Sequence, residues 1–238
     1  MSDGELLVLA RCTGFVFRAP GFSHPAVPPP ARAVLAYVLS LPLGRFGGSL
    51  HVAPARLAIA IACEVALGAA IGTAASLLYD GAYAGGRALD DYVGIRGSVP
   101  SANVTAAAGF GRLWSLAFTT GFFVLGGDRF ALQAFADAFG TLPPGTLVAQ
   151  SDLARLAFAL PATLLRAALF VAGPALALAF VVQIALGAIA RVVPRLGTFP
   201  LSFGVVLACA IVATLASVTS IVPAAATPWL DLSMLRAR

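Results

Sequence analysis

The sequence predicts an all-α, multi-helix integral membrane protein with broken, kinked helices and a C-terminal helical hairpin. Of its 238 residues, 60% are hydrophobic and only 11% are charged, whereas about a quarter of the residues of a soluble domain are charged. The mean hydropathy of +0.94 agrees with this class. Two apolar runs, 167–190 and 199–226, contain no charged residue. Each is long enough for a helix that crosses a bilayer.

The first 54 residues predict two short helices and two connections. An apolar helix over 6–16 contains Arg11 and ends before Ala19-Pro20. Three consecutive prolines close the next segment and favour an extended path. The four elements are a helix at 6–16, a loop at 21–30, a helix at 33–44 and a connection at 45–54.

The first helix of full spanning length is predicted at 57–79. Glu64, Gly68 and Gly72 follow one another at four-residue steps, so they share one face of this helix. Two glycines at this spacing allow another helix to approach closely. A carboxylate in an apolar helix is costly unless it is paired, hydrated or protonated. Glu64 is therefore either a polar lock to a neighbouring arginine or helix end, which we favour, or a proton or ion site.

The remaining elements are read from composition. The segment 80–100 is more polar and rich in glycine. Its part at 81–100, with Gly85, Gly94 and Pro100, is a candidate mobile element. A long helix starts near Ser151 and runs from Leu153 towards Ala190. Pro161 and Pro174 are its predicted kinks. Between these lie a short apolar helix at 113–125, an amphipathic helix at 130–139 and a turn at 141–145.

The hairpin tip lies at 186–203, between the two charge-free runs. Gly187 permits close helix approach, while Pro194 and Gly197 stop helical continuation. Arg191 and Arg195 keep the turn in a polar zone. We expect Gly187, Arg191, Pro194 and Phe199 to shape this tip and its contacts.

Several function classes are disfavoured. The 15 basic residues are all arginine and stand singly, so we expect no nucleic-acid partner. The three cysteines and two histidines have no metal-ligand spacing. Because no nucleophile motif, phosphate loop or pair of facing carboxylates is present, we expect no catalytic, cofactor or metal site and no enzymatic activity.

The order of these motifs resembles the FliR/SctT (YscT, SpaR) family of type III secretion export-apparatus proteins. The most specific part is Leu-Gly-x-x-x-Arg-x-x-Pro-x-Leu-x-x-Phe, which covers Leu186 to Phe199. Arg195 and Asp91 depart from the family pattern, which has Gln at the first position and often an amide at the second. The other matching pieces are Arg11 to Ala19-Pro20, Ser23, Val27-Pro28, Glu64, Leu67-Gly68, Gly72, Gly85, Gly94, Pro100, Phe135 to Phe139 and Thr141-Leu142-Pro143.

The resemblance implies a single export-gate membrane domain over 1–238. Its parts would be a FliP-like part at 1–150 and a FliQ-like helical hairpin at 151–238. It also implies a multi-pass location in the bacterial inner membrane, among lipid, at the base of a secretion system or flagellum. The implied partners are FliP/SctR-like, FliQ/SctS-like and FlhB/SctU-like subunits and the unfolded proteins that pass through the gate.

Two other functions stay open from the residues alone. A small-solute permease would need convergent polar groups near the membrane midplane. A lipid-modifying membrane enzyme would need clustered His, Asp or Glu at an interface. The sequence does not distinguish a flagellar system from a virulence injectisome.

Overall fold

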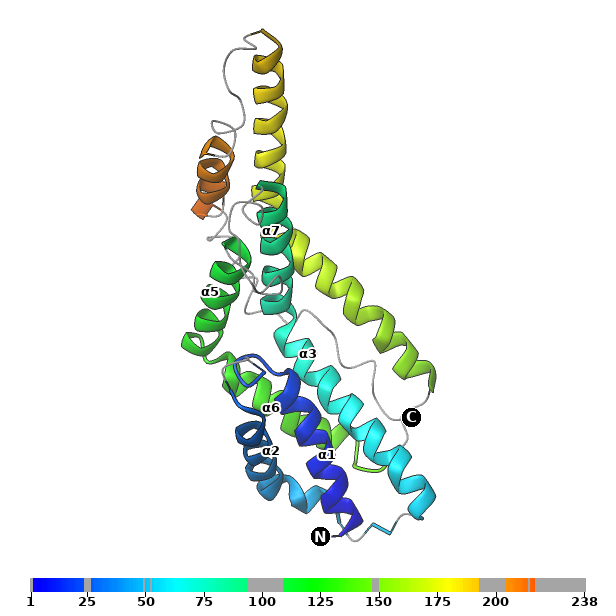
Figure 1. The fold of residues 1–238 in the computed structure, drawn as a ribbon. Coiled ribbons are helices and arrows are strands. Elements are labelled where there is room, and N and C mark those ends of the chain that lie inside the picture. Colours follow the sequence, from blue (N-terminus) through cyan, green and yellow to red (C-terminus); the bar gives the residue numbers. More distant parts are fainter. Residues whose placement is uncertain are drawn as a thin grey trace. The chain divides into compact units, whose positions relative to one another are not determined.

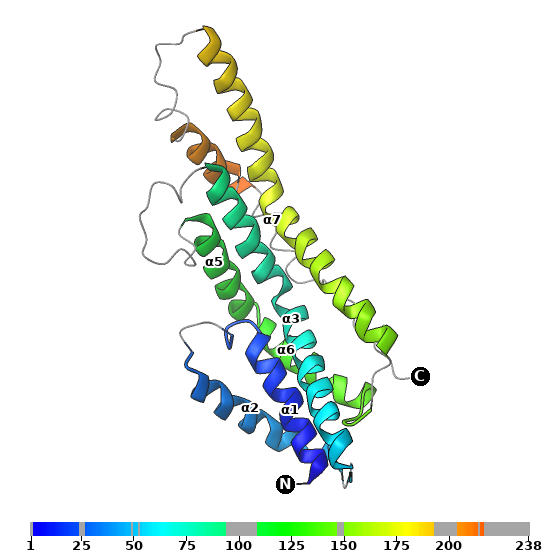
Figure 2. The same ribbon diagram turned by 45° about the vertical axis from the view of Figure 1, so that its right-hand side comes forward.

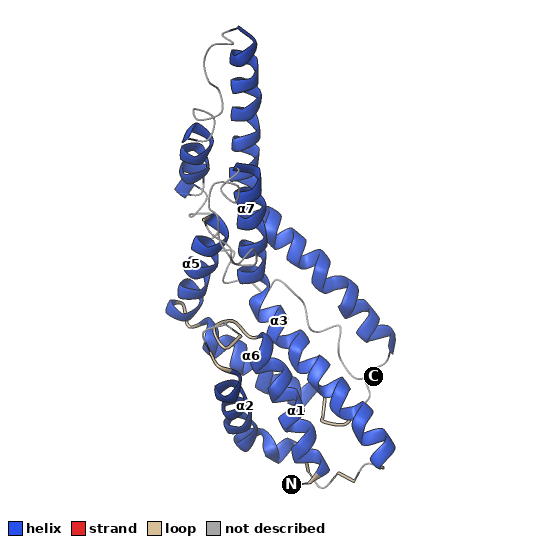
Figure 3. Cartoon of the chain, in the orientation of Figure 1, coloured by secondary structure: helices blue, strands red, loops and turns tan. Residues whose placement is uncertain are grey.

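The computed structural model describes residues 2–23, 27–48, 50–51, 53–93, 109–146, 150–192, 204–213 and 215–216. All regular elements within these ranges are helices (Figure 3), which confirms the all-α class. They are α1 (Asp3–Arg18), α2 (Pro29–Leu43), η1 (Gly44–Phe46), α3 (Pro54–Val93), α5 (Phe110–Val124), α6 (Gly127–Thr141), α7 (Gln150–Val192) and a further helix at Gly204–Ala213 (Figure 1).

The chain forms two compact units. The first contains the described parts of Met1–Leu77 and Gly121–Thr163, and the second contains those of Leu78–Thr120 and Leu164–Pro228. Helices α3 and α7 therefore contribute to both units. The predicted division into 1–150 and 151–238 follows a different boundary and stays a prediction.

Local sequence explains how the first two helices begin. In α1, the Ser2 hydroxyl accepts a hydrogen bond from Glu5 N at 3.2 Å, and the Glu5 carboxylate accepts one from Ser2 N at 2.9 Å. This reciprocal capping box satisfies two donors at the helix start. Helix α2 begins at Pro29, so the predicted loop over 21–30 is too long by two residues. Proline suits the first turn of a helix, because the N–H that it lacks has no partner there.

Phenylalanines dominate the core of the first unit. Phe15 of α1 stacks on Phe135 of α6 with ring centroids 4.2 Å apart, and Phe135 meets Phe139 edge-on at 5.3 Å. Figures 1 and 2 show α1 lying between α2 and the first half of α3. This core positions the polar site described below. Its buried members are Val8, Cys12, Phe15, Val16, Ala19, Ala36, Leu43, Ile71, Phe135 and Phe139.

Helix α3 is longer than the sequence predicts. It continues past Tyr79 to Val93, so the expected helix at 57–79 ends too early and the first part of the glycine-rich segment is helical. Gly81 and Gly85 weaken a helix in isolation. Here both lie against α7, where a Cβ on Gly85 would come within 2.7 Å of the Ala168 carbonyl oxygen. Close helix contact, which only glycine permits, offsets the weak intrinsic preference.

The second unit has its own apolar core. Leu89 of α3, Trp114 of α5, Val171 of α7 and Val206 of the last helix belong to one buried cluster. The two arms of the predicted C-terminal hairpin therefore pack together within this unit. Their connection lies outside the described residues.

Within the described ranges, two helices are long and apolar enough to cross a membrane, at Arg56–Val93 and Phe158–Val192. Pro161 and Pro174 both lie inside α7, which is not interrupted between Gln150 and Val192. Figure 1 shows a bend along this helix, as expected where proline removes a backbone hydrogen bond.

Candidate functional site

A buried ion pair joins α1 to α3 in the first unit. Arg11 Nε donates to Glu64 Oε2 at 2.5 Å, and both side chains are at most 2% exposed. A buried charge is stabilised only where an opposite charge and further hydrogen bonds compensate for lost water. Glu64 thus has an arginine partner, as in the polar lock that the sequence favours.

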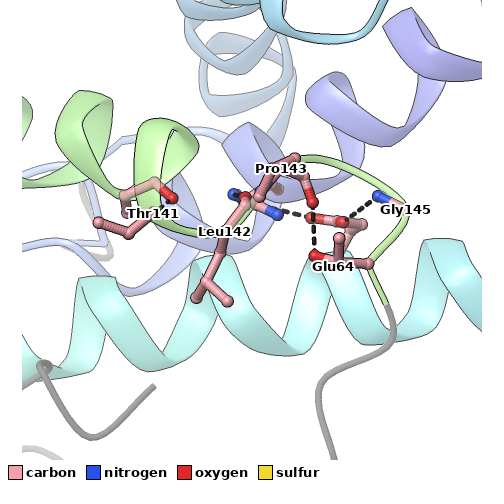
Figure 4. A network of polar contacts seen from close by, with 8 residues as sticks. Glu64, Thr141, Leu142, Pro143 and Gly145 are labelled. Atoms are coloured by element: carbon pink, nitrogen blue, oxygen red, sulfur yellow. Dashed lines mark hydrogen bonds and ion pairs between the residues drawn. The ribbon is translucent and has the colours of Figure 1, made fainter. Parts of the chain in front are cut away.

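The same two side chains hold the backbone of the turn after α6. Arg11 Nη1 donates to the Leu142 carbonyl oxygen at 2.7 Å, and Gly145 N donates to Glu64 Oε1 at 2.9 Å. Figure 4 shows Glu64 of α3 facing Gly145, with Leu142 on the same turn. Gly145 has a φ of +81°, a conformation that favours glycine. Three segments far apart in sequence therefore meet at one ion pair.

Among the described residues, the Arg11 guanidinium makes a further contact through its face and leaves one nitrogen without a partner. Its face lies over the Phe139 ring, with Cζ 4.5 Å from the ring centroid. Such a cation–π contact is favourable, but it does not replace a hydrogen bond. Arg11 Nη2 is buried and has no hydrogen-bond partner among the described residues.

Gly68 and Gly72 lie directly against α1, on the face of α3 that carries Glu64. A Cβ on Gly68 would overlap the Arg11 carbonyl oxygen, and a Cβ on Gly72 would lie 2.7 Å from the Phe15 carbonyl oxygen. Gly14 of α1 approaches the Val65 carbonyl oxygen in the same way. Small residues on both helices let the two backbones touch. The ion pair therefore sits beside the closest contact of α1 and α3.

The sequence reading missed several members of this site. It did not assign Arg11 to Glu64, although an arginine in an apolar run was a usable signal. Gly14 was not singled out, and Leu142 and Gly145 were included only as part of the predicted turn at 141–145. Leu142 and Gly145 contribute backbone atoms, which no side-chain pattern reveals.

A second buried carboxylate, also missed, lies in the second unit. Asp90 is 0% exposed. Its two oxygens accept hydrogen bonds from Phe110 N at 2.7 Å and Gly111 N at 3.0 Å. Asp90 therefore caps the first turn of α5, where backbone N–H groups lack partners within the helix. The backbones are also close here, since a Cβ on Gly86 would lie 2.6 Å from Gly111 Cα.

The chain matches the model of one protein family, described as bacterial export proteins, family 1, over residues 5–231. The chain belongs to this family. It is the FliR/SctT family that the motif order indicates. A comparison with curated proteins gives no match. Family membership and the two apolar helices identify a bacterial export protein of the membrane.

The export-family signature at the hairpin tip is only partly described. Gly187 and Arg191 lie in the last two turns of α7, and both are exposed. Apart from the adjoining part of α7 itself, nothing in the described chain lies within 4 Å of a Cβ built on Gly187. Its expected close packing is therefore not made inside the described chain. Pro194 and Phe199 lie outside the described residues, as do Gly94 and Pro100 of the predicted mobile element. Gly85, the third candidate of that element, lies inside α3 against α7.

The titratable residues of the described chain do not gather into a metal site. No group of three His, Cys, Asp or Glu residues that could hold a metal ion lies within the described ranges. The site is an assembly of a paired carboxylate, a guanidinium and backbone groups, and its evident chemistry is to hold three segments together.

Proposed function

We propose that this chain is a core subunit of the type III protein export gate in the bacterial inner membrane. It would assemble with FliP/SctR-like and FliQ/SctS-like subunits and contact an FlhB/SctU-like subunit. Unfolded proteins would pass through the pore that the assembly forms. The subunit would act by packing and by opening, without catalysis of its own.

The observation that carries this proposal is the family match over residues 5–231. It covers both compact units, so it concerns the whole arrangement of helices and not one motif. Export is the shared activity of the family by its description. The type III gate is the finer assignment, and it rests on the resemblance of the ordered motifs to FliR/SctT proteins.

Apolar surface that the chain leaves uncovered supports assembly with other subunits. Helix α2 has 15 residues, fewer than the about 20 needed to cross a bilayer. Nevertheless Val34, Val38 and Leu41 on α2 are all more than half exposed. An exposed apolar face of this kind marks a surface that binds protein or membrane. Since the helix is too short to span a bilayer, we assign this face to a neighbouring subunit.

The candidate contact residues with the most specific resemblance to the family are those of the hairpin tip. Only 22% of the apolar window of α7 is buried inside the chain. We propose that Gly187 and Arg191, with Pro194 and Phe199, contact neighbouring gate subunits. Gly94 and Pro100 would belong to a mobile element near the pore.

Deletion and co-purification test the proposal together. A strain that lacks this gene is expected to lose secretion of type III substrates, and a plasmid copy is expected to restore it. The tagged chain is expected to co-purify with the FliP-, FliQ- and FlhB-like subunits from solubilised membranes. Normal secretion by the deletion strain would refute the gate assignment, and loss of uptake of a small solute instead would favour a permease.

A single substitution tests the contact at the hairpin. Gly187→Leu adds a large side chain to an exposed position, so we expect less of the FliQ-like subunit to co-purify with the variant. Gly140→Leu on α6 is the matched control, because no described atom lies within 4 Å of a Cβ at either glycine. Equal recovery of the FliQ-like subunit with both variants would exclude Gly187 from this interface.

A further inference from the structure

The turn from Leu142 to Thr146 is attached to α1 and α3 through both members of one ion pair. The guanidinium of Arg11 binds the Leu142 carbonyl oxygen, and the carboxylate of Glu64 binds the Gly145 N–H. Both attachments use backbone atoms of the turn, so they depend on its position and not on its side chains. Losing the pair would remove both together.

The helices that carry the pair have a separate source of cohesion. Gly14, Gly68 and Gly72 bring the two backbones into contact, and Phe15 packs in the phenylalanine core. None of these contacts involves the turn. The packing of α1 on α3 therefore has a basis that does not depend on the ion pair.

The turn itself is short and locally closed. Thr146 N donates to the Pro143 carbonyl oxygen at 3.2 Å, so the turn keeps its own hydrogen bond without the pair. The Leu142 side chain is only 5% exposed while the turn is attached. Helix α7 begins at Gln150, soon after the turn.

One feature weakens the attached arrangement. Arg11 Nη2 is buried without an acceptor among the described residues, and a buried unsatisfied donor carries a free-energy cost. Opening the site would allow this donor to bind water. The attached arrangement is therefore a charge-assisted clamp that leaves one Arg11 donor without a partner among the described residues.

From these contacts we propose that Arg11 and Glu64 form a latch, which holds the turn at 142–146 and opens as a unit while α1 and α3 stay packed. The latch goes beyond the proposed gate function, because it concerns how this chain positions the start of α7. Arg11 and Glu64 are positioning residues in this role. The latch does not require any particular partner subunit.

Thiol labelling in native membranes tests the latch. The reporter is Leu142→Cys in a full-length chain whose native cysteines are replaced by Cys12→Ala, Cys63→Ala and Cys209→Ala. The latch is removed by Arg11→Met with Glu64→Leu, which leaves no unpaired charge in the core. We expect N-ethylmaleimide to modify the reporter at least about tenfold faster without the latch, because two charge-assisted hydrogen bonds are lost.

A second reporter separates opening from unfolding. Cys12 is 0% exposed in the core of the same unit, and burial raises the pKa of its thiol to about 12. In a chain that keeps Cys12 as its single cysteine, we expect labelling to stay slow after the latch is removed. Glu5→Gln is the control. It alters an α1 carboxylate that is hydrogen-bonded to Ser2 N and not to the turn, so it is expected to change neither labelling rate.

Faster labelling at position 142 with unchanged labelling of Cys12 supports the latch. If neither rate rises, the ion pair does not hold the turn and the proposal is wrong. If both rates rise together, the pair holds the whole unit and a separate latch does not exist. Export activity is not needed for any of these outcomes, so they are distinct from a failure of the gate assignment.

Discussion

The two compact units each bury a carboxylate, and the two carboxylates do different work. Glu64 in the first unit binds a side chain 53 positions away and a backbone N–H 81 positions away. Asp90 in the second unit binds two successive backbone N–H groups at the start of α5, 20 and 21 positions away. Glu64 takes part in joining three distant segments, whereas Asp90 of α3 caps the start of one helix, α5. Breaking the contacts of Glu64 should therefore lower the free energy of unfolding more than breaking those of Asp90.

The largest expected effect is that of Arg11→Ala. This change leaves Glu64 buried without its cation, which typically costs about 3–5 kcal/mol of folding free energy. An SDS titration of the full-length chain in mild detergent, followed by far-UV circular dichroism, measures the loss. A cost near zero would mean that Glu64 is not held as a buried ion in solution.

Removing both partners should cost less than removing one. Arg11→Met with Glu64→Leu replaces the pair by apolar groups of similar size, and such replacements are often close to neutral. In the same titration, we expect the double variant to be more stable than Arg11→Ala by about 2 kcal/mol. A double variant that is as unstable as the single one would show that packing at this site, and not charge, decides stability.

The glycine contacts give a comparison at intermediate cost. Gly68→Ala and Gly86→Ala each place a Cβ against backbone atoms, of Arg11 in one unit and of Gly111 in the other. Overpacking of this kind costs about 1–3 kcal/mol. Gly121→Ala and Gly140→Ala are matched helical controls in open space, and neither is expected to destabilise the chain. Thermal unfolding of these four variants and the unchanged chain ranks their stabilities, and an unaffected Gly68→Ala would contradict the close crossing of α1 and α3.

The smallest effect is expected at Asp90. Asp90→Ala removes the side-chain acceptor for Phe110 N and Gly111 N, and loss of such a helix cap costs about 0.5–2 kcal/mol. Hydrogen exchange of the first turn of α5 should rise more than that of α1. Equal exchange in both helices would contradict a local role for Asp90.

The sequence predicts the all-α class and the need of Glu64 for a polar partner. It does not predict features that depend on which helices contact each other. Glu64 is predictable because a carboxylate in an apolar helix needs a partner, and Arg11 carries the complementary charge in another apolar run. Which arginine pairs with Glu64 depends on how α1 crosses α3. Gly14, which permits this crossing, does not reveal it from the sequence alone.

The extent of α3 shows the same limit. Gly81, Gly85 and Gly86 indicate a break when only local preference is considered. The helix continues to Val93, and these glycines allow α7 and α5 to pack closely against it. Larger residues would not fit at these contacts. That close approach is a property of the folded units, and the spacing of the glycines along one segment does not reveal it. Asp90 was missed with it, because it binds backbone N–H groups at the start of another helix, which no side-chain pattern reveals.

The length of α3 has a geometric consequence for any membrane around it. Its 40 residues correspond to about 60 Å along the helix axis. The hydrocarbon core of a bilayer is about 30 Å thick, and a helix tilted by about 40°, the steepest tilt that is usual, uses only about 26 residues to cross it. A crossing of the bilayer by α3 therefore leaves at least about a third of its residues outside the hydrocarbon. The hydrocarbon thickness of a bilayer is therefore not sufficient to determine which part of α3 lies inside it.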